Sequence, residues 1–217
     1  MKRFIPAIII VLVGITFTYI LTDRPKPLKV FNPIDVNPEL VDESVRNIDK
    51  FHRVGTFSLT DQDGNNVTEK DFEGKIYVTD FFFATCPTIC PKMASQMNRV
   101  YNEFLENDDI RILSHTVMPE ADSVPVLKEY ADKLDVKSDK WKFVTGDKKQ
   151  IYNLARKTYF AAVTEGDGGV NDFIHTENFV LVDKEKRLRG FYDGTSKEDV
   201  DRLISDIYSL LEEYKEK

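Results

Sequence analysis

The sequence predicts an α/β domain, and three features of the chain carry this prediction. β-rich apolar runs alternate with segments of helical spacing, which is typical of sheets whose strands are joined by helices. The run over residues 75–83 has the character of a central strand that is covered on both faces. The two cysteines of the chain, Cys86 and Cys90, lie where this run ends and a helical pattern begins.

Elements in the first half of the domain follow from periodicity and turn residues. Residues 57–60 alternate apolar and polar side chains before the turn signal Asp-Gln-Asp-Gly at 61–64, which predicts a strand and a turn. Apolar residues at helical spacing predict helices over 91–105 and 124–134. A β-rich run between these helices predicts a strand over 111–118.

The second half supplies a short strand, a helix, a hairpin and a last helix. Their expected ranges are 142–144, 150–159, 179–182 with 188–192, and 200–211. This order, with cysteines at the first strand-to-helix junction, describes a thioredoxin-like three-layer sandwich with an added N-terminal strand or hairpin. In open α/β sheets, function gathers at the carboxyl ends of strands, which is where the cysteine loop lies.

The N-terminus is expected to anchor the chain in a membrane as a transmembrane helix. Residues 4–22 carry no formal charge, and at about 1.5 Å per residue such a helix just crosses a hydrocarbon core of about 30 Å. The rival interpretation, a signal peptide, lacks a convincing small-x-small cleavage site. Lys2 and Arg3 favour a cytoplasmic location for residues 1–3. We therefore expect a single-pass protein of the cell inner membrane whose soluble domain is extracytoplasmic (periplasmic).

Composition limits the domain count and the class of partner. Residues 23–52 are rich in Pro, Asn and acidic residues without a sustained period, which predicts a tether, and residues 53–217 form one domain. A domain of this size buries about 70% of its unfolded surface, so it needs no disulfide to fold. The formal net charge of −7, from 37 acidic and 30 basic residues, argues against a nucleic acid partner.

The cysteine loop has the composition of a reactive thiol site. Cys86 and Cys90 are each followed by proline, which disfavours the α region at both cysteines, so the loop is not expected to be a regular helical turn. Pro91 fits the first helical position and would place Cys90 at the N-cap, where the helix dipole and nearby Lys92 lower a thiol pKa. The pair suits either a reversible disulfide or a shared soft metal ion.

His175 is the candidate third ligand. It follows the glycine-rich stretch 165–169 and precedes a hairpin strand. Two thiolates with one imidazole suit copper, and such a set can hold Cu(I) in a low-coordinate site. A lone histidine also fits a structural role, and spacing does not decide between the two.

Four segments together resemble the Sco/SenC family. They are Cys-Pro-Thr-Ile-Cys-Pro at 86–91, Pro-Glu-Ala-Asp-Ser at 119–123, Val-Leu-Lys-Glu-Tyr at 126–130, and His175 shortly before Val-Leu-Val-Asp at 180–183. The resemblance implies a membrane-tethered copper metallochaperone that helps to assemble the CuA centre of cytochrome c oxidase. It implies Cys86, Cys90 and His175 as copper ligands, for Cu(I) and with Cu(II) as a further state. The CuA-bearing subunit is the implied partner, with other thiol or copper-carrier proteins as further partners.

One position departs from the family pattern. Met118 stands where the family usually has Asp before the Pro-Glu segment. Its thioether suits a copper contact, but a core methionine at a strand end is the favoured explanation, and core packing also explains Met93 and Met97. His115, inside a strand pattern, and His52, at the end of the tether, are expected to lie away from metal.

The rival function is enzymatic, whereas the metallochaperone is not an enzyme. In a thiol–disulfide oxidoreductase, Cys86 would attack a partner disulfide and Cys90 would resolve the mixed disulfide, with no need of His175. A peroxiredoxin-like peroxidase is a third alternative, and an interaction module with inert cysteines is the fourth. The copper hypothesis adds one expectation: protons compete for the ligands, so metal affinity falls on acidification.

Overall fold

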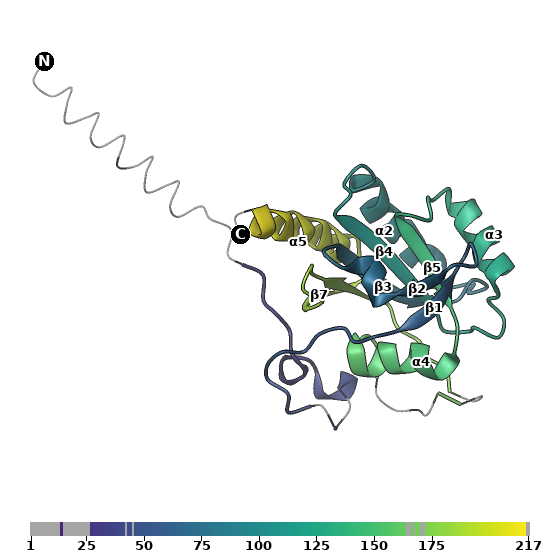
Figure 1. Ribbon diagram of the computed structural model, residues 1–217, viewed down its shortest axis with the longest axis horizontal. Coiled ribbons are helices and arrows are strands. Elements are labelled where there is room, and N and C mark those ends of the chain that lie inside the picture. Colours follow the sequence, from purple (N-terminus) through teal and green to yellow (C-terminus); the bar gives the residue numbers. More distant parts are fainter. Residues whose placement is uncertain are drawn as a thin grey trace, which may run out of the picture.

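Figure 1 presents a computed structural model that describes Gly14 and residues 27–215, apart from 42, 45, 164, 165, 167, 170 and 171. The predicted anchor at 4–22, except for Gly14, and the N-terminus at 1–3 lie outside the described residues. Within the described part of the chain, the structure has no helix whose length and apolar character would suit a membrane span.

A mixed sheet of seven strands, in the order β2-β1-β5-β4-β3-β6-β7, forms the middle layer of the described chain (Figure 1). The strands are β1 Ser58–Asp61, β2 Asn66–Thr68, β3 Ile76–Phe82, β4 Ile110–Thr116, β5 Trp141–Thr145, β6 Asn178–Val182 and β7 Leu188–Asp193. Strands β3, β4 and β5 are parallel, whereas β6, β7 and the β1–β2 hairpin pair antiparallel with their neighbours. The predicted thioredoxin-like sheet with an added N-terminal hairpin is confirmed.

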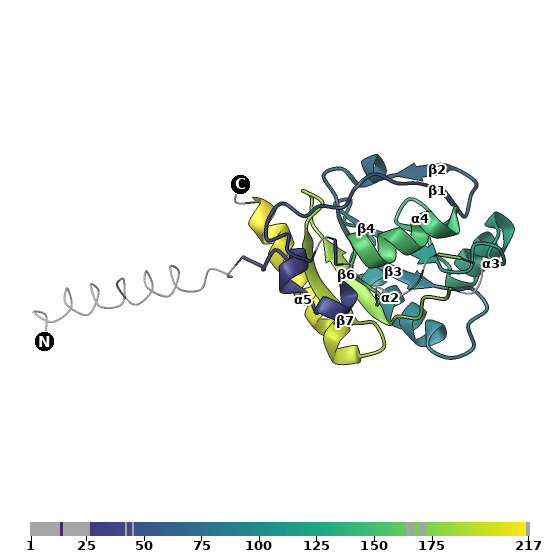
Figure 2. The ribbon, with the colours of Figure 1, turned by 90° about the horizontal axis from the view of Figure 1, so that it is seen from below.

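Helices cover both faces of this sheet. Their bounds are α2 Cys90–Glu103, α3 Val124–Leu134, α4 Lys148–Asn153 and α5 Lys197–Lys215, with 3-10 turns η2 Pro33–Asp35, η3 Pro38–Leu40 and η4 Glu69–Phe72. Viewed from below, α4 lies in front of β3 and β4 (Figure 2). Helices α2, α3 and α5 contribute to the core on the opposite face. The helix predicted over 150–159 is not uniform, because α4 continues as a π-helical turn, η5 Leu154–Thr158.

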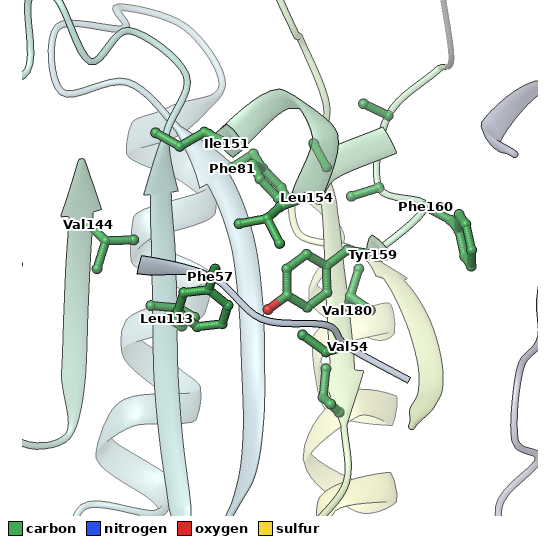
Figure 3. Close-up of a cluster of buried hydrophobic side chains, with 14 of the residues drawn as sticks. Val54, Phe57, Phe81, Leu113, Val144, Ile151, Leu154, Tyr159, Phe160 and Val180 are labelled. Atoms are coloured by element: carbon green, nitrogen blue, oxygen red, sulfur yellow. The ribbon is translucent and has the colours of Figure 1, made fainter. Parts of the chain in front are cut away.

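Strand β3 divides the hydrophobic core into two layers. All seven of its residues are buried, which confirms the prediction of a strand covered on both faces. Tyr77 and Phe81 face the α4 side, whereas Val78 and Phe82 face α2. Figure 3 shows part of the α4-side cluster, with Phe57, Phe81, Leu113, Val144, Leu154, Tyr159 and Val180 among its labelled side chains.

The expected tether, residues 23–52, contacts the domain where it is described. The Phe31 N–H donates to Leu188 O at 2.9 Å, and Leu28 O accepts a hydrogen bond of 2.7 Å from Arg189 Nη2. Val41 is fully buried within the α4-side core. This segment therefore adds to the outer layer of the fold beside β7.

Candidate functional site

The cysteine loop lies at the carboxyl end of β3. The loop leaves the sheet after Phe82 and enters α2 at Cys90. Both cysteines are free thiols, and Cys86 is 7% and Cys90 4% exposed. The Cys86 N–H donates to Phe83 O at 3.2 Å, which turns the chain directly after the strand. The parallel strands thus deliver both sulfurs to the edge at which α/β sheets usually carry function.

Helix α2 begins one residue earlier than predicted. Ile89 is its N-cap, and Ile89 O accepts from the N–H groups of Lys92 and Met93 at 3.0 and 2.9 Å. Cys90 therefore occupies the first turn, and its prediction as the N-cap is wrong. Proline fits the second helical position as well as the first, because neither needs an N–H donor for the helix.

The two thiols differ sharply in acidity. Burial acts to raise the pKa of Cys86, but hydrogen bonds from the backbone of Cys90 and Thr88 and from their side chains outweigh it and lower the pKa to about 7. Burial raises the pKa of Cys90 to about 12, and the Cys86 thiolate and the charge of Asp80 add to the rise. The helix start thus stabilises the Cys86 thiolate, and the predicted lowering of the Cys90 pKa is wrong.

These hydrogen bonds also define how the sulfurs meet. The Cys90 side chain helps to lower the pKa of Cys86, and the Cys86 Sγ lies 3.7 Å from Thr88 Oγ1. One sulfur is thus nucleophilic near neutral pH, and its protonated neighbour lies within hydrogen-bonding reach. Such a pair can close a disulfide, or it can offer two soft donors to one ion.

Asp80 is a buried carboxylic acid whose charge acts on Cys90, and sequence reasoning missed it. It lies on β3, on the same face as Val78 and Phe82, and accepts a hydrogen bond of 2.5 Å from Ser114 Oγ. Trp141 Nε1 donates in turn to Ser114 Oγ at 2.8 Å. Burial raises the pKa of Asp80 to about 7. The sequence signal that could have identified Asp80 was an acidic residue inside a largely apolar central strand.

Asp122 fastens the cysteine loop to the segment after β4. Its Oδ2 accepts from the Ala84 N–H at 3.0 Å and also from the Thr116 hydroxyl. The side chain is fully buried. Asp122 thus ties the backbone two residues before Cys86 to the carboxyl end of the neighbouring strand. The sequence signal was the Pro-Glu-Ala-Asp-Ser segment, from which no role for Asp122 was inferred.

Strand pairing brings the His175 segment to the same edge of the sheet. Strand β6 runs antiparallel to β3, with Thr79 opposite Val180. Residues that precede β6 therefore lie beside residues that follow β3. The rings of Phe83 and Phe173, with centroids 5.5 Å apart, contact each other across this edge. His175, two residues beyond Phe173, is thus a neighbour of the cysteine loop.

The imidazole itself is exposed between two fixed residues. Ile174 and Thr176 are buried on either side of His175, and Thr176 Oγ1 donates to Ala161 O at 2.5 Å. Among the described residues, no three His, Cys, Asp or Glu side chains stand close enough together to hold a metal ion. The structure therefore brings the two thiols together but does not group His175 with them, and its role as a ligand stays a prediction.

The other histidines and methionines have structural surroundings. His115 is fully buried, stacks on Phe81 and places Nδ1 3.1 Å from Thr79 Oγ1. His52 Nε2 lies 2.8 Å from Thr158 O. Three methionine side chains of the described residues pack in the core: Met93 and Met97 are buried in the same cluster as the cysteines, and Met118 is partly buried on the α4 side.

Comparisons with known proteins agree with these features. A family model described as SCO1/SenC matches residues 45–212. The SCO1 protein homolog of Bacillus subtilis is 34% identical over 160 residues, which cover 73% of this chain and 82% of that protein. A structure of BsSco, described as a Sco-family cytochrome c oxidase assembly protein with a disulfide switch, has a TM-score of 0.62 and 34% identity and covers 73% of this chain and 93% of that one. Copper-bound ScoI of Arabidopsis thaliana has a TM-score of 0.59 and 28% identity, and covers 74% and 99% of the two chains.

Proposed function

The chain belongs to the SCO1/SenC family, and we propose that it is a membrane-tethered copper metallochaperone that assists assembly of the CuA site of cytochrome c oxidase. Two relatives support this proposal: BsSco is described as belonging to a family of oxidase assembly proteins, and Arabidopsis thaliana ScoI was solved with copper bound. In this chain, the supporting observation is the pair of free, buried thiols, which shift each other's pKa, at the edge beside the His175 segment.

The donor set fits a soft, low-coordinate copper ion. Thiolates are the ligands that Cu(I) prefers, and an imidazole can complete the set. Cys86 reaches its thiolate form near neutral pH, whereas Cys90 keeps its proton until copper replaces it. His175 would approach from the adjacent segment as the third ligand. Binding therefore releases protons, and copper affinity falls as the pH is lowered.

Transfer follows from the small number of ligands. Thiolates of the acceptor would replace Cys86, Cys90 and His175 one at a time, so that copper passes through an intermediate shared by both proteins. The acceptor is the CuA-bearing subunit, and other thiol or copper-carrier proteins would supply the copper. Residues 4–22 would hold the domain at the periplasmic side of the inner membrane, which protease protection of intact and opened cells can test.

Anaerobic Cu(I) titration of the purified chain against a chelating probe tests the ligand set. Cys86→Ser and Cys90→Ser each remove a thiolate and are expected to weaken binding at least 100-fold, and His175→Ala to weaken it about 10-fold. His52→Gln is the matched control, because its imidazole bonds to Thr158 O instead. Full affinity in Cys90→Ser would refute a two-thiolate site, and full affinity in His175→Ala would remove the imidazole from it.

A second candidate function rests on the difference between the thiol pKa values. An acidic Cys86 beside a protonated Cys90 is also the arrangement that thiol–disulfide exchange requires. Metal-free reduction of a model protein disulfide separates the two functions. Rapid turnover would favour the oxidoreductase, whereas slow turnover with tight copper binding would favour the metallochaperone.

A further inference from the structure

A buried ion pair lies in the segment that leads to His175. The Arg156 guanidinium donates two hydrogen bonds to the Asp172 carboxylate, 2.5 Å from Nη1 to Oδ2 and 2.7 Å from Nη2 to Oδ1. The two side chains are 6% and 7% exposed. Asp172 stands three residues before His175, so whatever fixes its carboxylate also limits where His175 can lie.

Val163, Gly166 and Gly168 lie close to this pair. Arg156 Nε donates to Val163 O at 3.0 Å, and the Gly168 N–H donates to Asp172 Oδ2 at 2.7 Å. Gly166 has a φ of 127°, and a Cβ there would lie 2.4 Å from both Asp172 oxygens and 2.5 Å from Arg156 Nη2. Glycine is therefore needed at this position for close approach of the backbone to the ion pair.

The pair is also joined to the helical side of the fold. Arg156 belongs to η5, and its guanidinium lies over the Tyr152 ring, 5.3 Å from the centroid. The Tyr152 hydroxyl lies 2.9 Å from Val117 O and 3.2 Å from Asp172 O. One aromatic residue therefore links the end of β4 to the start of the His175 segment. A π-helical turn at this point agrees with the frequent occurrence of such turns at functional sites.

A buried ion pair contributes little net stability, because the desolvation of both charges offsets their attraction. Its value lies in fixing one arrangement of the chain. We propose that Arg156 and Asp172 are positioning residues for copper binding, which hold the segment from Asp172 to Thr176 so that the His175 imidazole is presented to the Cys86–Cys90 edge. This inference rests on the proposed function and deepens it.

The first test uses metal-free protein. Hydrogen exchange of the full chain, purified in detergent, is followed by mass spectrometry in Asp172→Asn and in the control Glu129→Gln, which weakens an exposed ion pair with Lys133. Exchange across residues 172–176 is expected to rise at least 10-fold in Asp172→Asn and to stay unchanged in the control. Wild-type exchange in Asp172→Asn would overturn the proposal.

The second test measures Cu(I) affinity in two backgrounds. Asp172→Asn is expected to weaken binding about 10-fold in the wild-type chain and to have no further effect in His175→Ala. An equal loss in both backgrounds would mean a general structural role and overturn the proposal. No loss in either background would overturn it as well, while the proposed function stands if Cys86→Ser, Cys90→Ser and His175→Ala still weaken binding.

Two further measurements cover the cases in which Asp172→Asn does not fold or the wild-type protein does not bind copper. If Asp172→Asn does not fold, the double variant Arg156→Met with Asp172→Leu replaces it, because removing both charges of a buried pair is tolerated better than removing one. If wild-type protein fails to bind copper, the proposed function fails. The hydrogen exchange of residues 172–176 then still decides whether the pair holds this segment.

Discussion

At the scale of single residues, the site depends on an unequal division of the helix-start donors. Hydrogen bonds from the backbone of Cys90 and Thr88 lower the pKa of Cys86, while Cys90 is buried in the α2-side core, where burial and the charge of Asp80 raise its pKa. Two chemically identical side chains, four positions apart, therefore differ in acidity. Under the proposed function, Cys86 would therefore meet an electrophile or a metal ion first, and Cys90 would act second.

Alkylation by iodoacetamide tests this division. Since hydrogen bonds lower the pKa of Cys86 to about 7, its thiolate is present above that pH and is lost below it. The Cys86 rate is expected to rise about 50-fold from pH 5 to pH 7 and to level off above pH 8. Peptide mass spectrometry measures each rate, and in Cys86→Ser the remaining Cys90 should react slowly up to pH 9. A Cys86 midpoint near pH 9 would contradict the assignment.

At the scale of elements, the loops after β3 and β4 form one unit with the segment before β6. Asp122 accepts a hydrogen bond from the loop after β3. Tyr152 contacts both the loop after β4 and the segment before β6. The antiparallel pairing of β6 with β3 then places the segment before β6, which carries His175, beside the residues that follow β3. The strands determine at which end of the sheet the site lies, and the Asp122 and Tyr152 side chains hold its loops in place.

Removal of the Asp122 carboxylate is expected to destabilise this unit. In Asp122→Ala, the N–H of Ala84 and the hydroxyl of Thr116 lose their acceptor, which costs about 1–3 kcal/mol of unfolding free energy. Urea denaturation of the reduced protein measures the loss. Ser123→Ala is the matched control, because this exposed N-cap makes no side-chain capping bond, and it should change stability by less than about 0.5 kcal/mol. Equal urea denaturation midpoints for Asp122→Ala and Ser123→Ala would show that the hydrogen bonds of Asp122 do not stabilise the fold.

At the scale of the whole molecule, one buried charge network joins Leu28 and helix α5 to the β6–β7 hairpin. Arg189 Nη1 donates to Asp183 Oδ2 at 2.8 Å, Nη2 donates to Glu213 Oε2 at 2.6 Å, and Nη2 also donates to Leu28 O. Burial acts to raise the pKa of Asp183, but hydrogen bonds from Arg187 and Arg189 outweigh it and lower the pKa. The network fastens α5 and the N-terminal segment to the strand that flanks β6.

Removal of the Arg189 guanidinium is expected to lower the free energy of unfolding. Arg189→Leu removes the charge-assisted hydrogen bonds to Asp183 and Glu213, while Asp183 keeps its ion pair with Arg187, so we expect a cost of about 1.5–3 kcal/mol. Lys133→Ala, at an exposed pair with Glu129, should cost less than about 1 kcal/mol. Denaturant midpoints of the two variants make the comparison. A loss below about 1 kcal/mol in Arg189→Leu would contradict the network's role.

Local sequence patterns were enough to predict much of the fold and the place of the thiol pair in it. The apolar run before Cys86 predicted a strand buried on both faces, and the spacing of Met93 and Met97 predicted core positions; both predictions are confirmed. The helix was predicted to begin at Pro91 but begins at Cys90, and the predicted direction of the Cys90 pKa shift was wrong. Proline is compatible with two adjacent positions, and the direction in which donors point depends on the folded loop.

Chain order and side-chain period thus establish the elements, the thiol pair and the edge of the sheet at which it lies, because these depend on contacts between near neighbours. The partners of Asp80, Asp122 and Arg156 depend instead on how strands pair and how loops close over distances of up to 38 residues. Local periodicity carries no information on such pairings, since the same residues at the same spacing fit many registers. The folded chain selects one of them through close packing and the requirement that buried charges find partners.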